Sequence, residues 1–157
     1  MNEDLTLLAR YNTWANTKVF ELCASAGESE LLRAEGYQPV PEILRHLVHV
    51  ESNFLRMSLD EERVPVDAEP LPALAARCAG IDAGYERLAA DASPEDLGRE
   101  FHVPWFGFDV TVREAILQAL THSQKHRADV CMLLPSVGVD APGLDLIQWL
   151  AESRGRA

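Results

Sequence analysis

Residues 111–134 read TVREAILQALTHSQKHRADVCMLL, and this segment says most about how the chain folds. Apolar side chains recur along it at steps of three and four, which places them on one face of a predicted helix. Pro135 and Gly138 follow and are expected to end that helix. His122 and His126 lie four positions apart on the same face, about one turn from each other. The segment therefore predicts an amphipathic helix that presents two imidazoles side by side toward an apolar interior.

Proline and glycine divide the rest of the chain into further periodic segments. The other predicted helices span about 2–26, 41–59 and 72–90, with a short last one at about 143–152. Residues 60–71 and 91–109 are predicted as long connections, with at most a brief hairpin at Val110, since no segment shows strand alternation. Two long connections exclude a simple up-down-up-down arrangement. We therefore predict an all-α four-helix bundle that forms a single domain over residues 1–157, plus a short C-terminal helix.

The bulk properties place the protein in a broad class. Its 157 residues suit one domain with its own core. The formal net charge of −11 argues against a nucleic-acid partner, which needs clustered lysine and arginine. No apolar run approaches the ~20 residues needed to span a membrane, and the acidic N-terminus lacks a secretion-signal pattern. Three scattered cysteines fit a reducing compartment. We expect a cytoplasmic protein that binds neither nucleic acid nor membranes.

A third histidine extends the pair on residues 111–134. His46 lies between Ile43 and Val50 on the apolar stripe of the predicted helix 41–59. One histidine on such a face is more often a core residue bonded to a carbonyl than a metal ligand, and an HxxxH pair alone is weak evidence for a metal site. Three buried imidazoles without partners would be costly, whereas one ion satisfies them together. We predict a metal site formed by His46, His122 and His126 with an open coordination position, as in catalytic zinc sites. The Glu-x-x-His motif of di-iron bundles does not occur.

Three further residues are candidates for the pocket around this site. His49 lies one turn from His46 and could either carry protons at the mouth of the site or lie at the helix surface. Glu51 and Asp129 could orient a ligand imidazole through its second nitrogen, with surface salt bridges as the alternative. The aromatic loop 103–108 is interpreted as core packing rather than as a cover over the metal. No catalytic residue can be named from the sequence.

Four segments also follow one another in a recognisable order. They are Tyr11-Asn-Thr-Trp14-Ala-Asn16, Ile43-Leu-Arg-His46-Leu-Val-His-Val-Glu51, His122-Ser-Gln-Lys-His126-Arg127 and Gly138-x-x-x-Pro142-x-x-Asp145. Together they resemble the DinB superfamily, also described as DinB/YfiT-like metalloenzymes, over nearly the whole chain. The resemblance implies an up-down-down-up bundle, frequent homodimers, and a site for Zn²⁺, Ni²⁺ or a similar ion such as iron or manganese. It carries the ligand role onto His46, His122 and His126 only. One departure is that Ala128 and Asp129 stand where the family often has Gly and Gln.

The resemblance also suggests functions for a metal held in this way. Some relatives are thiol transferases that use bacillithiol, mycothiol or glutathione, and others are isomerases with a thiol cofactor. By analogy, the metal would bind the thiolate of a low-molecular-weight thiol and direct it at a small-molecule electrophile. A metal-dependent hydrolase that uses metal-bound water is the alternative chemistry. A non-enzymatic metal-binding protein of the stress response is the alternative from another class.

Overall fold

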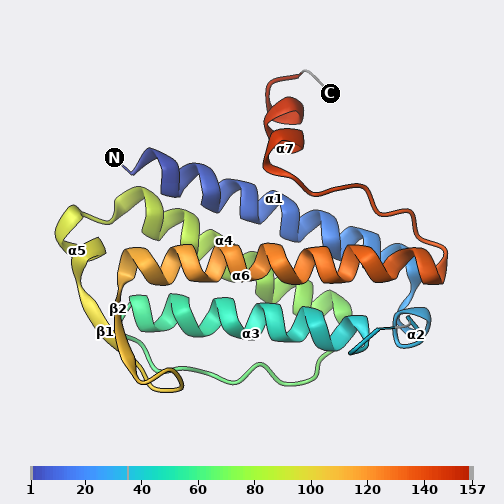
Figure 1. The fold of residues 1–157 in the computed structure, drawn as a ribbon, viewed down its shortest axis with the longest axis horizontal. Helices are drawn as coiled ribbons and strands as arrows, with labels where there is room; N and C mark the ends of the chain where they lie inside the picture. The colour runs from blue at the N-terminus through green and yellow to red at the C-terminus, as the bar shows by residue number, and fades with distance from the viewer. Residues whose placement is uncertain (1, 35, 156–157) are drawn as a thin grey trace.

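The computed structural model describes residues 2–34 and 36–155, and long helices dominate it (Figure 1). The bundle consists of α1 (Glu3–Ala26), α3 (Val40–Ser58), α4 (Leu71–Asp91) and α6 (Val112–Leu133). These helices agree with the periodic segments of the sequence to within a few residues. The prediction of an all-α helical bundle is confirmed.

The helices are arranged up-down-down-up. In Figure 1, α1 and α6 run in one direction, and α3 and α4 run in the other. Helix α1 packs against α4 and α6, and α3 packs against the same two helices. Residues 59–70 form the predicted crossover connection and return along the length of the bundle, so α4 starts at the same end as α3 (Figure 1). This connection passes along the outside of α3 and becomes a wall of the functional site.

Several short elements fill the connections. They are α2 (Glu28–Leu31), α5 (Pro94–Gly98), the antiparallel strands β1 (Glu100–Val103) and β2 (Phe108–Thr111), the 3₁₀ helix η1 (Leu134–Val137) and α7 (Leu146–Ser153). Val110 pairs with Phe101, which confirms the hairpin expected there. Residues 91–109 are therefore not a plain loop. Helices α2 and α5 escaped the sequence analysis because four or five residues are too few to show a helical period.

The start of α6 is fixed by a capping box. The Thr111 hydroxyl accepts a hydrogen bond from the Glu114 backbone amide at 3.2 Å. In return, the Glu114 carboxylate accepts from the Thr111 backbone amide at 2.8 Å. Such a reciprocal pair satisfies two backbone amides that the first helical turn leaves without partners. It sets where α6, the helix that carries His122 and His126, begins.

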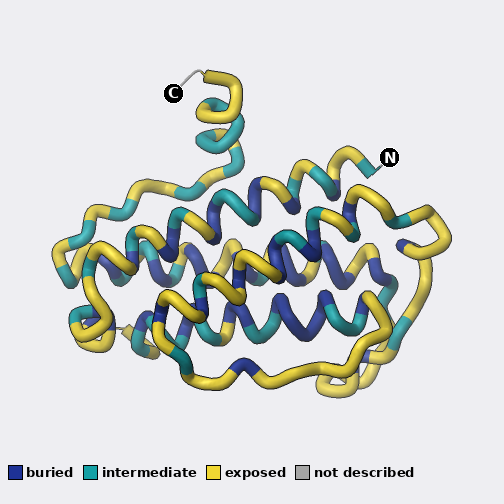
Figure 2. Tube along the Cα trace, turned by 180° about the vertical axis from the view of Figure 1, so that it is seen from behind, coloured by how far each residue is buried: buried dark blue, intermediate teal, exposed yellow. Residues whose placement is uncertain are grey.

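The core lies between the four long helices. Figure 2 shows buried residues along their inner sides and exposed residues along their outer sides. Helices α3 and α4 approach so closely that a Cβ added at Gly84 would lie 2.5 Å from Cδ2 of Leu55. Gly84 weakens the helix as an isolated segment, but it permits this close packing. None of the helices in the described ranges is long and apolar enough to cross a membrane.

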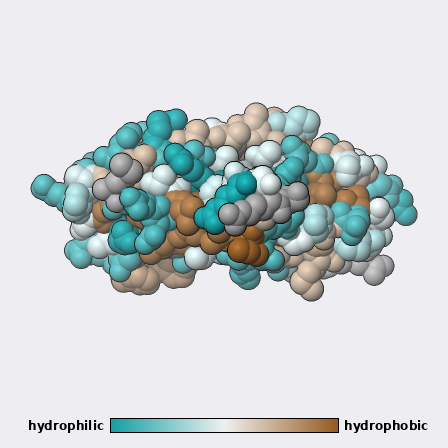
Figure 3. Space-filling view, turned by 90° about the horizontal axis from the view of Figure 1, so that it is seen from above, coloured by the Kyte–Doolittle hydropathy of each residue, from teal (hydrophilic) through white to brown (hydrophobic). Residues whose placement is uncertain are grey.

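The C-terminal helix α7 is attached to α1 rather than inserted in the bundle. None of its residues is buried, and it stands away from the other helices (Figure 1). The Tyr11 hydroxyl donates to the carbonyl of Leu144 at 2.5 Å, and the Trp14 indole donates to Glu152 at 3.0 Å. Seen from above, the surface around α7 carries several separate hydrophobic patches among hydrophilic residues (Figure 3). The aromatic residues of the Tyr-x-x-Trp motif therefore hold the C-terminal segment.

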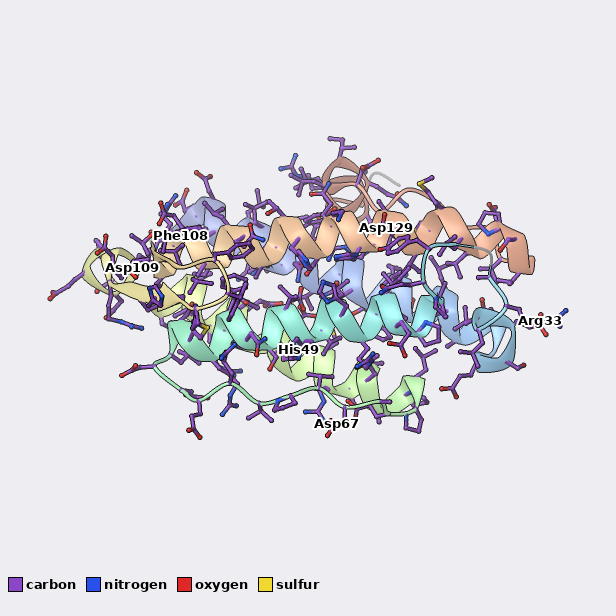
Figure 4. All side chains as sticks on the ribbon, turned by 60° about the horizontal axis from the view of Figure 1, so that its bottom comes forward. Arg33, His49, Asp67, Phe108, Asp109 and Asp129 are labelled. Carbon is purple, nitrogen blue, oxygen red and sulfur yellow. The ribbon has the colours of Figure 1, made fainter. Side chains whose placement is uncertain are left out.

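The prediction that the aromatic loop 103–108 packs in the core is wrong. Trp105, Phe106 and Phe108 are 45, 60 and 55% exposed. Trp105 makes an edge contact with Phe54 of α3, with ring centroids 5.8 Å apart. Figure 4 shows Phe108 at one end of the bundle, whereas His49 lies near the middle. The hairpin therefore does not cover the histidine site.

Candidate metal centre

Three imidazoles from two neighbouring helices come together on one side of the bundle. The ring centroid of His46 on α3 lies 5.1 Å from that of His122 and 4.9 Å from that of His126, both on α6. One nitrogen of each ring lies within 4.8 Å of the other two. An ion bound at ~2.1 Å holds its ligand nitrogens about 3.4 Å apart. The Nε2 atoms of His122 and His126 are 3.2 Å apart, which is close to that spacing.

The site is open to solvent rather than enclosed in the core. His126 is buried, His122 is half-buried and His46 is exposed. The expectation that all three lie on an inward stripe is therefore wrong for His46, which sits where α3 meets the surface. The rings form part of a cavity of about 730 Å³, lined by α3, α6, residues 37–38 and residues 65–67 of the crossover connection. An ion held here would keep coordination positions facing that cavity.

The three imidazoles are neutral at neutral pH and so have lone pairs available. The pKa of His122 is lowered to about 4, first by burial and then by the positive charges that His126 and His46 would carry. The pKa values of His46 and His126 are also lowered, in each case chiefly by burial. Metal binding requires deprotonated ligands. These pKa shifts mean that binding near pH 7 does not first have to remove protons from the imidazoles.

Asp129 lies where an orienting carboxylate was predicted. Its Oδ2 atom is 3.1 Å from Nδ1 of His126 and accepts a hydrogen bond from the Tyr37 hydroxyl at 3.1 Å. The contact with His126 has the length of a hydrogen bond but not its direction, so Nδ1 stays buried without a hydrogen-bond partner. A small rotation of the ring would complete this bond. Nδ1 of His122 is also buried without a partner in the described part of the chain.

His49 attaches the crossover connection to α3. Its Nδ1 accepts from the backbone amide of Val66 at 3.4 Å, and its Nε2 lies 3.0 Å from the side-chain amide of Asn53. The Asn53 atom at this distance is Nδ2, so which of the two groups donates depends on the tautomer of the ring. His49 lines the same cavity as the three other histidines, on α3 beside the crossover residue Asp67 (Figure 4). The residue is half-buried, and the bond to Val66 makes it a support for the cavity wall.

Glu51 is placed in a different part of the bundle from the one the sequence suggested. It is fully buried, and its Oε1 accepts from Asn12 at 2.8 Å and from Ser123 at 2.6 Å. Among the described residues, none of its hydrogen bonds goes to a histidine of the cavity. Glu51 therefore does not orient a ligand imidazole directly.

Glu51 belongs to a buried polar network to which all four long helices contribute. Its members are Asn12, Asn16, Glu51, Cys78, Asp82, Ser123 and Arg127. The side-chain amides of Asn12 and Asn16 donate to both Glu51 and Asp82. Their carbonyl oxygens accept from Nη1 of Arg127 at 2.6 and 2.7 Å. This network was not predicted from the sequence. The signal that could have indicated it was the presence of polar side chains, such as Asn12 and Asn16, on apolar helix faces.

The carboxylates and thiol of this network also have the spacing of a metal site. Ligand atoms of Glu51, Cys78 and Asp82 lie within 4.8 Å of one another. Burial and the neighbouring charge of Glu51 raise the pKa of Asp82 to about 8, and burial raises the pKa of Cys78 well above its ordinary value. An ion would have to displace protons from both groups. The histidine cluster is neutral and open to solvent, so it is the better candidate for a metal.

The raised pKa of Asp82 predicts that stability falls as the pH rises toward 8. Near pH 7 the folded protein holds a proton on Asp82 that the unfolded chain, with the ordinary pKa of 3.8, has released. The folded state then binds more protons, so the free energy of unfolding decreases by up to about 1.4 kcal/mol per pH unit. The lowered histidine pKa values act in the opposite direction, and their effect fades as the pH rises from 6.5 to about 7.5, where imidazoles of the unfolded chain lose their last protons.

The measurement is urea denaturation of the metal-free protein between pH 6.5 and 8. In the Asp82→Asn variant the decrease over this range should be largely absent, because the amide has no proton to lose. Equal slopes for the variant and the wild type would contradict the assignment of the proton to Asp82.

The fold and the cavity define the chain as an up-down-down-up helical-bundle protein with a candidate three-imidazole metal site. The family model described as DinB family matches residues 1–155, and the chain therefore belongs to the DinB family. This confirms the resemblance inferred from the four motifs. No curated protein matches the chain.

Proposed function

We propose that the protein binds one divalent metal ion through His46, His122 and His126 and uses it as an enzyme that transfers a low-molecular-weight thiol to a small-molecule electrophile. The observation that carries the proposal is the cavity of about 730 Å³ into which the three neutral imidazoles open. Cavities of this size suit a small thiol together with a substrate. Zn²⁺ and Ni²⁺ are the favoured ions, with iron and manganese as alternatives, because imidazole nitrogen suits several transition metals.

Other residues around the cavity would orient the ligand imidazoles and support the cavity wall. When bound, the ion would supply Lewis acidity that favours the thiolate form of a thiol. The carboxylate of Asp129 lies 3.1 Å from Nδ1 of His126, which supports a role in orienting that ring, and the Tyr37 hydroxyl donates to the same carboxylate. His49 fixes the crossover connection that forms the opposite wall. These contacts support three preset ligands within a cavity that remains accessible.

The exposure of His46 favours a catalytic ion over a structural one. Structural zinc is usually enclosed by four protein ligands, often thiolates. Here the candidate ligands are three imidazoles at the surface end of a cavity, and Cys131 lines a different cavity next to residues 141–145. This arrangement supports an ion that exchanges its remaining ligands.

The thiol function predicts a direct response of the metal to thiols. In the Co²⁺-substituted protein, 2-mercaptoethanol should produce a sulfur-to-cobalt charge-transfer band, whereas pH alone should not. The fully metallated protein should then conjugate at least one of several low-molecular-weight thiols to an electrophile. A cobalt spectrum that changes with pH but not with thiols would instead indicate metal-bound water and a hydrolase. A metal that raises the melting temperature without any turnover would indicate the non-enzymatic alternative.

We further propose that the chain forms a homodimer in the cytoplasm and that residues 1–157 act as a single domain. The support is membership of a family in which the resemblance implies frequent dimers, together with the scattered cysteines and the acidic composition. Light scattering coupled to gel filtration would measure the mass. A monomer at micromolar concentration would contradict the dimer.

A further inference from the structure

Two basic residues lie beside the histidines of the cavity. Arg45 directly precedes His46 on α3, and Lys125 directly precedes His126 on α6. Both side chains line the same cavity as the imidazoles. Lys125 is one of only two lysines in a chain whose formal net charge is −11. Two positive charges beside the histidines are therefore a local exception in a chain that is acidic as a whole.

The two basic residues differ in how their charge is balanced. Arg45 is paired with Glu42, one turn earlier on α3. Lys125 takes part in none of the ion pairs within 4.0 Å in the described ranges. The nearby Asp129 is already engaged by Tyr37 and lies against His126. Lys125 is thus an exposed residue at the lining of the cavity that has no ion-pair partner within 4.0 Å in the described ranges.

Lys125 lies close to the histidine cluster by its place on α6. It is three positions after His122, about one helical turn, and directly before His126, and all of them line the same cavity. An anion bound at the histidine end of the cavity would be attracted by the positive charge of Lys125. In addition, Nε of Arg45 is buried and has no hydrogen-bond partner among the described residues.

We propose that Lys125 forms a subsite for an anionic group of the ligand, so that the preferred thiol carries a carboxylate a few bonds away from its sulfur. This inference rests on the proposed function, because it assumes that the sulfur end of the ligand faces the three histidines. The flexible stem and compact charge of lysine suit pairing with carboxylates of varied position. Arg45 on α3 is a second hydrogen-bond donor for the anionic group. It limits the loss of anion affinity when Lys125 alone is replaced.

Two thiols of equal length test the subsite. 3-Mercaptopropionate and 3-mercaptopropionamide have the same sulfur and chain, but only the first is an anion. Their dissociation constants can be measured from the charge-transfer band of the Co²⁺-loaded protein. Lys125→Gln should weaken binding of 3-mercaptopropionate by about 1.5- to 5-fold, the range of one exposed ion pair, and leave the amide unchanged. Added salt should reduce the preference of the wild type for the carboxylate.

Lys18→Gln is the matched control, since it changes the net charge equally at an exposed site on α1 that pairs with Glu21. It should leave both constants unchanged, and cobalt content should be equal in all three proteins. If Lys125→Gln weakens both thiols equally or neither, the anion subsite is overturned while thiol binding stands. If the wild-type spectrum responds to neither thiol, the proposed function fails and this inference fails with it.

Discussion

Replacement of Arg127 by methionine is expected to lower the free energy of unfolding by about 1–3 kcal/mol, because buried amide oxygens that lose their hydrogen-bond donor are costly. Arg127 is only 2% exposed, and it donates to the carbonyl oxygens of Asn12 and Asn16. The amide groups of those two residues donate in turn to Glu51 and Asp82. Without the guanidinium, two buried carboxyl groups lose the positive charge nearest to them, and two amide oxygens lose their donor.

Urea denaturation of the metal-free protein measures this effect. Arg113→Met provides a control on the same helix at an exposed position and should change stability by no more than about 0.5 kcal/mol. If Arg127→Met does not fold, Arg127→Lys retains the charge without the planar fork and should give an intermediate loss. A cost below about 1 kcal/mol for Arg127→Met would show that the network contributes little to stability.

Loss of one histidine of the cavity should abolish most of the metal affinity without unfolding the bundle. We expect His122→Ala to weaken Zn²⁺ or Ni²⁺ binding by more than about 100-fold, because even the loss of an orienting neighbour costs 10–100-fold. Asp129→Asn should weaken metal binding by about 10- to 100-fold. The α-helix content of His122→Ala should match that of the metal-free wild type, since the ring is half-buried at a cavity rather than inside the core.

Competition with a chelator of known affinity measures the metal constants, on protein purified without a metal-binding tag. His102→Ala is the matched control. His102 is exposed, pairs with Asp109 at 2.7 Å and belongs to the hairpin at the end of the bundle. It should leave the affinity unchanged. Equal metal affinity for His122→Ala and the wild type would exclude the three-imidazole centre.

The parts of the molecule that local periodicity governs could be predicted from the sequence. The four-residue spacing of His122 and His126 determines that their rings are neighbours on any helix. His46 could be placed near them because its segment is helical and the bundle leaves few neighbours for α6. Its exposure could not be predicted, since that depends on how α3 packs and on where the crossover connection passes.

Long-range packing decided the points that the sequence analysis missed or got wrong. Asn12 and Asn16 lie on an apolar face, but their partners come from three other helices, and no local pattern reports such partners. The aromatic residues Trp105 and Phe106 carry no periodicity, and hydrophobicity alone placed them in a core that does not extend over the hairpin. For Glu51 the sequence left open an orienting role toward a ligand imidazole and a surface salt bridge, whereas its side chain is buried in the interior.

At the level of the cavity, helix α6 has one side bonded to the interior and an adjacent side that carries the imidazoles. Ser123 follows His122 and Arg127 follows His126, and consecutive residues of a helix point about 100° apart. One side of α6 is thus anchored in the interior by Glu51, Asn12 and Asn16, while the adjacent side presents the imidazoles. The helix cannot roll about its axis without breaking those interior bonds. The direction in which the two imidazoles face the cavity and His46 is therefore fixed by residues on the other side of the helix, which do not line the cavity.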